Sequence, residues 1–405
     1  VRVEQLSGAV EVDAFEEELL GGGSSKESFD VLVSTPEKLQ FVIRNKKVAR
    51  PLVLLVVDEA HNLEDEARGL RIELLIATVK RDCQSAAFLL LMPNVPNADD
   101  LTRWLDPDSG KTISLSTSAW QPNDRIVGVF HAASEPARRG DWQLRYKTVI
   151  TDPGTTCLSG EHRVGAVRPL DISFAKARAT LSAQAVGMAA AFSDRGTSIA
   201  VGSTVPNTWS MAKLAASRFG PFDDVPDDIQ LVQQYLRNEI GPDYELVDLL
   251  GCGVAVHHSA LSDEARTMIE WLAEHGSLRV LCATTTIAQG INFPVSSVFL
   301  ASRKYPYGKE MSHRAFWNLA GRAGRIGHDS VGVVGLAAGT NPVEVERYIG
   351  LATENLVSRL VSLLDELEQA GRLNDLELVI EEDQWSDFRC YVAHLWNEKR
   401  SLDAV

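Results

Sequence analysis

The strongest constraint on the fold is a run of six apolar residues, 52–57, followed at once by Asp58 and Glu59. Half of the six are β-branched, which is typical of a strand buried on both faces in the middle of a parallel sheet. In an open α/β sheet, ligands bind beyond the carboxyl ends of such strands. The two acids therefore fall where a cation bound to a phosphate would lie.

The acid pair suits phosphoryl transfer. Asp58 can hold Mg²⁺ directly or through water, and Glu59 can orient and deprotonate an attacking water. Acids also follow strands merely because they are soluble in a turn. Ala60 and His61 complete the sequence DEAH, which favours the catalytic interpretation. We therefore predict Asp58, Glu59 and His61 as catalytic residues, with Asp58 and Glu59 as the metal ligands.

Bulk properties limit the class of protein. The chain has 405 residues, of which 45% are hydrophobic and 23% charged, so we expect a soluble globular protein of two to three domains. The sequence contains no run of eighteen apolar residues, so we predict no membrane-spanning helix. The five cysteines lie far apart without paired spacing, which favours a reducing cytoplasm over a disulfide framework or a zinc site. The net charge of -15 disfavours a broad basic face, so contact with nucleic acid would be local.

Hydroxyl side chains follow several predicted strands. Pro36 can occupy the first turn of a helix whose free amides, with Ser34 and Thr35, could receive a backbone phosphate; a plain capped helix start explains the same residues. Ser203 and Thr284 occupy similar places after the predicted strands 198–201 and 279–283. His257 and His258 suggest a metal, yet no third ligand has suitable spacing, so hydrogen-bonded loop histidines are favoured.

A pair of arginines ends a predicted helix near residue 320. Ser312 can cap that helix, which runs into Gly321-Arg322-Ala323-Gly324-Arg325. Arginines three apart share one helical face, so both can point into a single cleft. No acid follows closely to pair with them, and we interpret Arg322 and Arg325 as phosphate ligands.

Six motifs stand in a fixed order: STPEKL (34–39), DEAH (58–61) with a following Arg68-Gly69 and Glu73, VPNADDLTRWL (95–105), VAVHHSALSDEAR (254–266), LCATTTIAQGINFPV (281–295) and NLAGRAGR (318–325). Together they resemble the superfamily-two DExH helicases, in the branch of the exosome-associated Ski helicase, the spliceosomal unwindase and the archaeal repair helicases. The resemblance runs from about residue 34 to 336, roughly three quarters of the chain.

The resemblance implies two RecA-like domains that close on ATP, Mg²⁺ and single-stranded or partly duplex RNA or DNA. Asp58 and Glu59 would be the Walker B pair, and Arg322 and Arg325 the fingers that reach the γ-phosphate. The remaining implied site residues are Gln289, Gly290, Asn292 and Asn318 for the nucleotide, and Thr35, Ser203 and Thr284 for the nucleic-acid backbone.

Three departures from the family pattern affect the function. Met92-Pro93-Asn94 stands where the family has Ser-Ala-Thr before its Pro-Asn pair, so hydroxyls that tie the ATP state to the strand are gone. Asn318 replaces a Gln. No Walker A lysine occurs: in Ser109-Gly110-Lys111-Thr112 the required first glycine is Leu105, and residues 113–116 alternate like a strand.

The predicted fold class is α/β, with two RecA-like parallel-sheet domains, the first truncated, and a small, mainly helical C-terminal segment. The predicted bounds are 1–120 for the incomplete first domain, 121–170 for an inter-domain passage, 171–340 for the second domain, and 341–405 for the start of a helical or winged-helix domain.

Two functions remain open. The first is an ATP-dependent helicase or translocase whose phosphate loop lies upstream of Val1, which leaves this chain alone inactive. The second is a degenerate core that binds nucleic acid or a partner protein without turnover.

Overall fold

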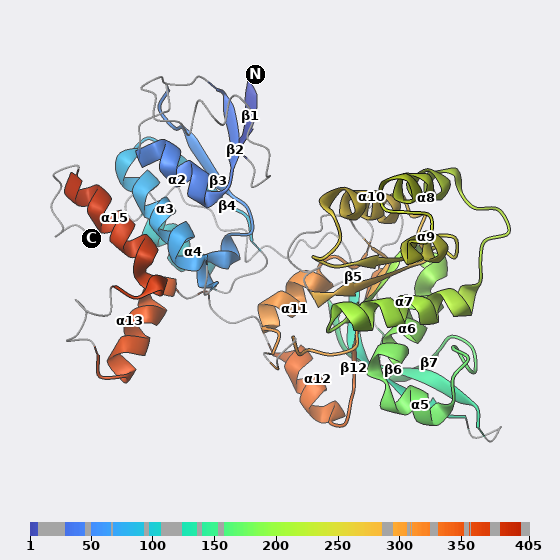
Figure 1. Cartoon of the computed structure of the whole chain (residues 1–405). Helices are drawn as coiled ribbons and strands as arrows, with labels where there is room; N and C mark the ends of the chain where they lie inside the picture. Colours follow the sequence, from blue (N-terminus) through green and yellow to red (C-terminus); the bar gives the residue numbers. More distant parts are fainter. Residues whose placement is uncertain are drawn as a thin grey trace. The chain divides into compact units, whose positions relative to one another are not determined.

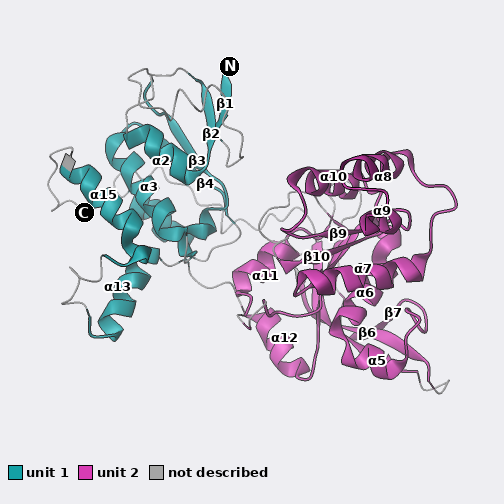
Figure 2. Cartoon of the chain, viewed as in Figure 1, with its two compact units in different colours: residues 1–117, 354–405 teal, residues 118–353 magenta. Residues whose placement is uncertain are grey.

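A computed structural model describes most of the chain as two compact units (Figure 2). Unit 1 comprises Val1–Thr117 and Glu354–Val405, and unit 2 comprises Ser118–Thr353. The described residues are 1–6, 29–44, 50–65, 68–92, 97–106, 124–135, 140–152, 158–285, 295–305, 308, 310–324, 331–351, 356, 358–372 and 381–397.

Unit 1 contains two parallel strand pairs and their helices (Figure 1). Strand β1 (Val3–Leu6) pairs with β2 (Val31–Ser34), and β3 (Leu54–Val57) pairs with β4 (Ala87–Leu90). The helices are α2 (Pro36–Arg44), the 3₁₀ helix η1 (Ala60–Glu64), α3 (Gly69–Asp82) and α4 (Ala98–Leu105). The parallel pairing confirms the α/β class predicted from the apolar strand.

Strand β3 differs from its prediction in burial. Leu55 is 5% exposed and packs in a cluster with α3, whereas Leu54 and Val56 are 50% and 47% exposed. The prediction that residues 52–57 form a strand buried on both faces is therefore wrong. Side chains alternate across a strand, and α3 packs on the face that carries Leu55.

The C-terminal helices belong to unit 1. They are α13 (Arg359–Gln369), the 3₁₀ helix η6 (Asp383–Trp385) and α15 (Ser386–Asn397). They pack on the second apolar side of α3, where Leu70 and Leu74 meet Leu363, Leu367 and Trp385. The mainly helical character predicted for this segment is confirmed. The predicted bounds differ, because this apolar stripe of α3 is covered by chain that lies about 290 residues further on.

Unit 2 is built on one eight-stranded sheet of order β7-β6-β5-β12-β11-β8-β10-β9. From β5 to β9 all neighbours are parallel, and β5-β6-β7 is antiparallel. The strands are β5 (Asp124–Ser134), β6 (Trp142–Asp152), β7 (Glu161–Val164), β8 (Ser198–Gly202), β9 (Val254–His257), β10 (Val280–Thr284), β11 (Ser297–Leu300) and β12 (Val331–Ala337).

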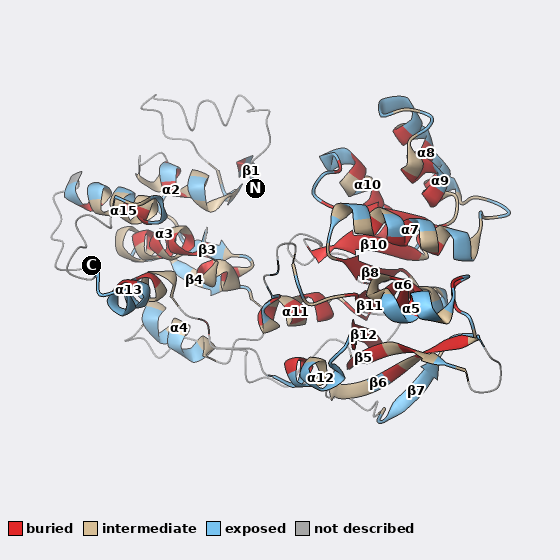
Figure 3. Cartoon of the chain, turned by 60° about the horizontal axis from the view of Figure 1, so that its bottom comes forward, coloured by how far each residue is buried: buried red, intermediate tan, exposed pale blue. Residues whose placement is uncertain are grey.

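Helices surround this sheet and leave its central strands buried (Figure 3). Every residue of β8, β9, β10 and β11 is buried, as near-continuous apolar sequence predicts for parallel strands covered on both faces. The helices are α5 (Phe174–Ala179), α6 (Leu181–Phe192), the 3₁₀ helix η2 (Ser193–Arg195), α7 (Val205–Phe219), α8 (Asp227–Glu239), α9 (Glu245–Leu250), α10 (Asp263–Glu274), α11 (His313–Ala320) and α12 (Pro342–Gly350).

The predicted passage at 121–170 is instead part of this sheet. Strand β5 pairs in parallel with β12, and β6 and β7 extend the same edge. Trp142 is fully buried and its indole N–H donates to the carbonyl of Ile172 (2.9 Å). The Tyr146 hydroxyl reaches the carbonyls of Ile126 and Val334. The sequence does not show that this hairpin joins the sheet, because the strand that pairs with β5, β12, begins about two hundred residues further along the chain.

Within the described residues, no helix has the length and apolar character needed to cross a membrane.

Candidate functional site

The DEAH residues form a tight turn where β3 ends. Asp58 is exposed, and its Oδ1 accepts a hydrogen bond from the Glu59 amide (2.9 Å). His61 Nδ1 lies 3.1 Å from Glu59 Oε2. The turn is tied to the end of β4, because the Ala60 amide donates to the Leu91 carbonyl (2.9 Å) and the Leu91 amide donates to the Val57 carbonyl (2.9 Å). Two neighbouring strand ends thus fix the loop.

Glu59 occupies a strained backbone conformation. Its φ of 50° and ψ of 42° are left-handed, which costs about 1–2 kcal/mol for a residue with a Cβ. The fully buried Ala60 and the pairing of His61 with the Glu59 carboxylate hold this conformation in place. The strain places the Glu59 carboxylate, 34% exposed, where a ligand can reach it.

The donor set fits a magnesium ion bound together with phosphates. Among the described residues, no three His, Cys, Asp or Glu side chains gather as a complete protein metal site. Mg²⁺ does not need one, since it takes one or two carboxylates and completes its shell with water and substrate phosphates. Asp58 and Glu59 are the residues that would hold it.

In unit 2, Arg322 lies just beyond the end of α11. Ser312 caps this helix as predicted, accepting from the Ala315 amide (3.1 Å). The helix ends at Ala320, however, so the predicted helical face shared by Arg322 and Arg325 is not formed by regular helix. Gly324 has a φ of 101°, a backbone conformation that favours glycine. Arg325 lies outside the described residues.

The Arg322 turn is hydrogen-bonded to Val295, which lies two residues before β11. The Val295 amide donates to the Arg322 carbonyl (3.1 Å), and the Gly324 amide donates to the Val295 carbonyl (2.7 Å). A Cβ on Gly332 of β12 would lie 2.4 Å from the Ala323 carbonyl oxygen, so glycine is required there. Gln289, Gly290 and Asn292, which also precede Val295, lie outside the described residues. Asn318 is half-buried on α11, one turn before Arg322.

Two residues of unit 2 that are predicted to bind the nucleic-acid backbone lie at the carboxyl ends of neighbouring strands. Strands β8 and β10 are parallel neighbours, with Thr284 opposite Gly202, the residue before Ser203. Thr204 caps α7 by accepting from the Asn207 amide (3.3 Å). Ser203 and Thr284 are therefore brought together at the carboxyl ends of adjacent strands. Thr35 follows β2 in unit 1, and its carbonyl accepts from the Leu39 amide in the first turn of α2 (3.0 Å).

The adjacent histidines at the end of β9 are hydrogen-bonded, as predicted. His257 Nε2 lies 2.8 Å from Glu270 Oε1, and the Trp209 indole N–H donates to His258 Nε2 (3.1 Å). Burial lowers the pKa of His257, although the hydrogen bond to Glu270 opposes this. Burial, followed by the neighbouring His257, lowers the pKa of His258. Both rings are therefore predominantly neutral at pH 7.

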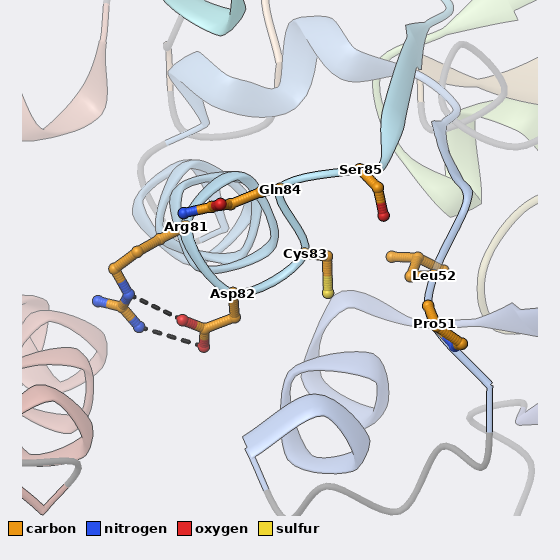
Figure 4. Close-up of a pocket in the computed structure, with 7 residues that line it drawn as sticks. All are labelled: Pro51, Leu52, Arg81, Asp82, Cys83, Gln84 and Ser85. Carbon is orange, nitrogen blue, oxygen red and sulfur yellow. Dashed lines mark hydrogen bonds and ion pairs between the residues drawn. The ribbon is translucent and has the colours of Figure 1, made fainter.

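A hollow of unit 1 lies before the starts of β3 and β4, at the opposite end of these strands from the DEAH loop. Figure 4 shows the residues that line it. The hollow measures about 600 Å³ and adjoins an ion pair between Arg81 and Asp82 (2.9 Å). Burial, with a smaller effect from Asp82, raises the pKa of the Cys83 thiol there, so it is not an activated nucleophile. The lining residues are Pro51, Leu52, Arg81, Asp82, Cys83, Gln84 and Ser85.

The sequence of the chain matches known helicases across both units. A DEAD/DEAH box helicase family model matches residues 2–96, and a helicase conserved C-terminal domain model matches residues 230–327. The ATP-dependent DNA helicase Hel308 of Pyrobaculum calidifontis is 28% identical over 347 residues, which cover 82% of this chain and 43% of the relative. The DExH-box ATP-dependent RNA helicase DExH12 of Arabidopsis thaliana is 26% identical over 383 residues, 90% of this chain and 16% of the relative.

The chain is therefore similar to the superfamily-two DExH-type helicases in both of its units. The Hachiman protein HamB of Bacillus cereus is 26% identical over 367 residues, which cover 85% of this chain and 32% of the relative. The chain thus spans less than half the length of each of these relatives. The two helicase family matches, one in each α/β unit, support two RecA-like domains as the fold.

The sequence predicted the DEAH loop, the cap of α11 and the hydroxyl side chains at the strand ends. It missed the partners Trp209 and Glu270, which follow only from the fold. It also assigned no task to Glu73, although the motif beginning at Arg68-Gly69 was visible in the sequence.

Proposed function

We propose that this DExH-type chain forms the core of an ATP-dependent nucleic-acid helicase or translocase, in which ATP hydrolysis drives movement along a strand. The DEAH loop is the observation that carries the proposal: two acids follow a parallel strand, and the second is held in a strained turn beside His61. The names of the relatives Hel308 and DExH12, an ATP-dependent DNA helicase and an ATP-dependent RNA helicase, support the same class of reaction.

Each site residue then has a role in that reaction. Asp58 holds the magnesium ion that accompanies ATP, and Glu59 orients the attacking water and accepts its proton. His61 keeps the Glu59 carboxylate in place. Arg322 and Arg325 neutralise charge on the transferred phosphoryl group, while Gln289, Gly290, Asn292 and Asn318 relate the nucleotide to the strand.

The nucleic-acid ligand in this proposal is single-stranded or partly duplex RNA or DNA. Thr35, Ser203 and Thr284 contact its backbone through hydroxyls and nearby amides, which suits a chain of net charge -15. Such contacts carry no base identity. The dispersed cysteines remain the support for a reducing compartment such as the cytoplasm.

The 405 residues by themselves should bind ATP weakly and hydrolyse it near background. They contain no Walker A loop, whose lysine and amides cradle the β- and γ-phosphates. A phosphate-release assay on the purified 405-residue chain checks this, and robust turnover would contradict it.

The catalytic roles are tested by variants made in the whole open reading frame, so that the result does not depend on where these 405 residues begin. Glu59→Gln keeps the shape of the side chain but removes the base, so ATP affinity should survive while turnover falls, on the order of 10² or more for loss of a catalytic base. Glu239→Gln, on the exposed end of α8, is the matched control and should retain the parental rate.

Arg325→Ala should also spare binding and lower turnover, on the order of 10³ to 10⁵ for an arginine finger. Arg322→Ala should lower turnover and also weaken the ground-state complex, if that side chain touches the phosphates throughout the cycle. Arg103→Ala removes an exposed arginine of α4 and serves as the control. ATPase rates and nucleotide affinities are measured at saturating nucleic acid; parental hydrolysis by Arg325→Ala would make Arg325 a structural residue.

A second candidate is a scaffold that binds nucleic acid or a partner protein without turnover. The departure at Met92-Pro93-Asn94 favours it, because hydroxyls that link the nucleotide to the strand are replaced at the end of β4. Binding of a labelled oligonucleotide that is tight but unaffected by ATP, together with no hydrolysis from the whole reading frame, would establish the scaffold instead.

A further inference from the structure

The motif formed by Arg68-Gly69 and Glu73 after the DEAH loop has no task in the proposed chemistry. The residues around it indicate a task in positioning the loop. Gly69 begins α3, and a Cβ there would lie 2.2 Å from the Leu63 carbonyl oxygen and 3.2 Å from the Cβ of Arg359. The turn after the DEAH loop and the start of α13 therefore meet at this glycine. A larger residue would force them apart.

One turn along α3, the Glu73 carboxylate binds the start of α13. Its Oε1 accepts a hydrogen bond from the Ser358 hydroxyl (2.6 Å), and its Oε2 accepts from the Leu360 amide (3.2 Å). Ser358 is itself the cap of α13 and accepts from the Val361 amide (3.1 Å). The free amides at a helix start carry partial positive charge, so a carboxylate is favourable there. Glu73 thereby fastens α13 to α3.

A second side chain, that of Asn97, binds both the backbone carbonyl and the backbone amide of Leu356. Asn97 Nδ2 donates to the Leu356 carbonyl (2.9 Å), and the Leu356 amide donates to Asn97 Oδ1 (2.8 Å). One side-chain amide thus satisfies both polar groups of a residue that is only 6% exposed. Asn97 immediately precedes α4, so this bond joins the returning chain to a different element from the one that Glu73 holds.

The Leu356 side chain enters the core cluster that supports the DEAH loop. It shares this cluster with Leu55 of β3 and Leu63 of η1. Leu55 precedes the DEAH residues by three positions and Leu63 follows them by two. The loop is therefore flanked on both sides by residues in the cluster that contains Leu356.

We propose that Glu73 and Asn97 are positioning residues for the hydrolytic loop. They hold Leu356 and the start of α13, so that Leu356 keeps the core beside the DEAH loop filled and Glu59 retains its strained conformation. The segment they hold begins six residues after α12 of unit 2 ends at Gly350, so it is also the return connection between the units. This assignment rests on the proposed function, because the reaction it serves is hydrolysis at that loop.

The test uses Glu73→Ala, Asn97→Ala and the conservative Glu73→Gln in the whole open reading frame. Misplacement of the loop should lower kcat on the order of 10- to 100-fold, while KM for ATP stays near the parental value. Glu73→Gln keeps one acceptor and should fall between parent and Glu73→Ala. Glu366→Ala is the matched control: it breaks the ion pair of Glu366 with Arg359 on the same helix (3.0 Å) without touching α3. It should retain the parental kcat.

Hydrogen exchange supplies a readout that needs no activity. In Glu73→Ala, amides of residues 58–64 and of residues 358–372 should both exchange faster than in the parent, while those of β8 and β10 in unit 2 should not change. Faster exchange confined to 358–372, with parental kcat, would make Glu73 a structural anchor and overturn the proposal. If the parent protein hydrolyses no ATP, the proposed function fails, and exchange at 58–64 still decides whether Glu73 and Asn97 position the loop.

Discussion

Strands β3 and β11 are both four residues long and mainly apolar, yet their surroundings differ. Val298, Phe299 and Leu300 of β11 are all 0% exposed, whereas Leu54 and Val56 of β3 are 50% and 47% exposed. Strand β11 has β8 and β12 as parallel neighbours, while β4 is the neighbour described for β3. Apolar sequence therefore marks what a strand can bury. Whether both of its faces are buried depends on cover supplied by other elements.

We expect the largest effect on stability at Phe299, a fully buried residue of β11. Its ring packs against those of Phe130 and Phe192, with ring centroids 5.9 Å and 5.3 Å away. Phe299→Ala should lower the free energy of unfolding of unit 2 by about 3–5 kcal/mol, since it removes a fully buried ring and leaves a cavity. Denaturant unfolding followed by exchange at β8 and β11 measures it. A loss below about 1 kcal/mol would mean that this core is less well packed than β11 indicates.

Within β3, adjacent leucines provide a sharper contrast. Leu55→Ala should cost about 2–3 kcal/mol because Leu55 is buried against α3, and Leu54→Ala should cost less than about 1 kcal/mol. Both variants delete the same atoms from the same strand, so each is the other's control. Equal losses in urea unfolding would show that the outer face of β3 is covered in solution.

The buried histidines should make unit 2 sensitive to acid. The pKa of His258 is lowered in the folded chain, so between its ordinary value of 6.5 and the lower folded value the unfolded chain binds more protons. Stability should therefore fall as the pH drops below about 6.5. Protonation would also remove the acceptor for the Trp209 indole N–H, a bond worth about 1 kcal/mol.

His258→Gln is the variant that isolates this effect. Its amide oxygen can still accept from Trp209, but it does not titrate. Between pH 7 and 5 the unfolding free energy of unit 2 should fall less in His258→Gln than in the parent, by about 1 kcal/mol. Identical pH profiles would exclude His258 as the source of the acid sensitivity.

The smallest expected change in stability concerns the exposed apolar positions of unit 1. Leu54→Thr should alter the unfolding free energy by about 0.5 kcal/mol or less, while it lowers the binding of an apolar dye and the tendency to aggregate. Dye fluorescence and light scattering of parent and variant measure this. Val298→Thr in β11 provides the contrast, because a hydroxyl there enters a closed core and should destabilise unit 2.

Much of unit 2 could be predicted from short stretches of sequence. The apolar runs before Ser203 and Thr284 form the predicted strands β8 and β10, and Ser312 caps α11 by accepting from the Ala315 amide. These features depend on neighbours within four residues, so local sequence suffices. The assignment of β5 and β6 to this sheet was missed, because it depends on pairing with the distant strand β12.

The candidate site likewise has some features that the sequence predicted and others that only the structure shows. The order of residues placed Asp58 and Glu59 after a strand, and it brought Ser203 and Thr284 to strand ends that the sheet makes adjacent. The left-handed turn at Glu59 and its pairing with His61 appeared only in three dimensions. The end of α11 before Arg322 also required the structure, because the bonds from Val295 compete with continuation of the helix.

The sequence by itself determined the strands, the helix caps, the DEAH loop and the helicase family, because each is encoded by residues that are close along the chain or stand in fixed order. Tertiary structure alone decided which strand faces are buried, where β5–β7 join the sheet, and that helices α13 and α15 pack on α3. Glu73 shows the physical reason. A carboxylate on a helix can face solvent, a cation or a helix start, and only the chain that arrives 285 residues later settles which of these it meets.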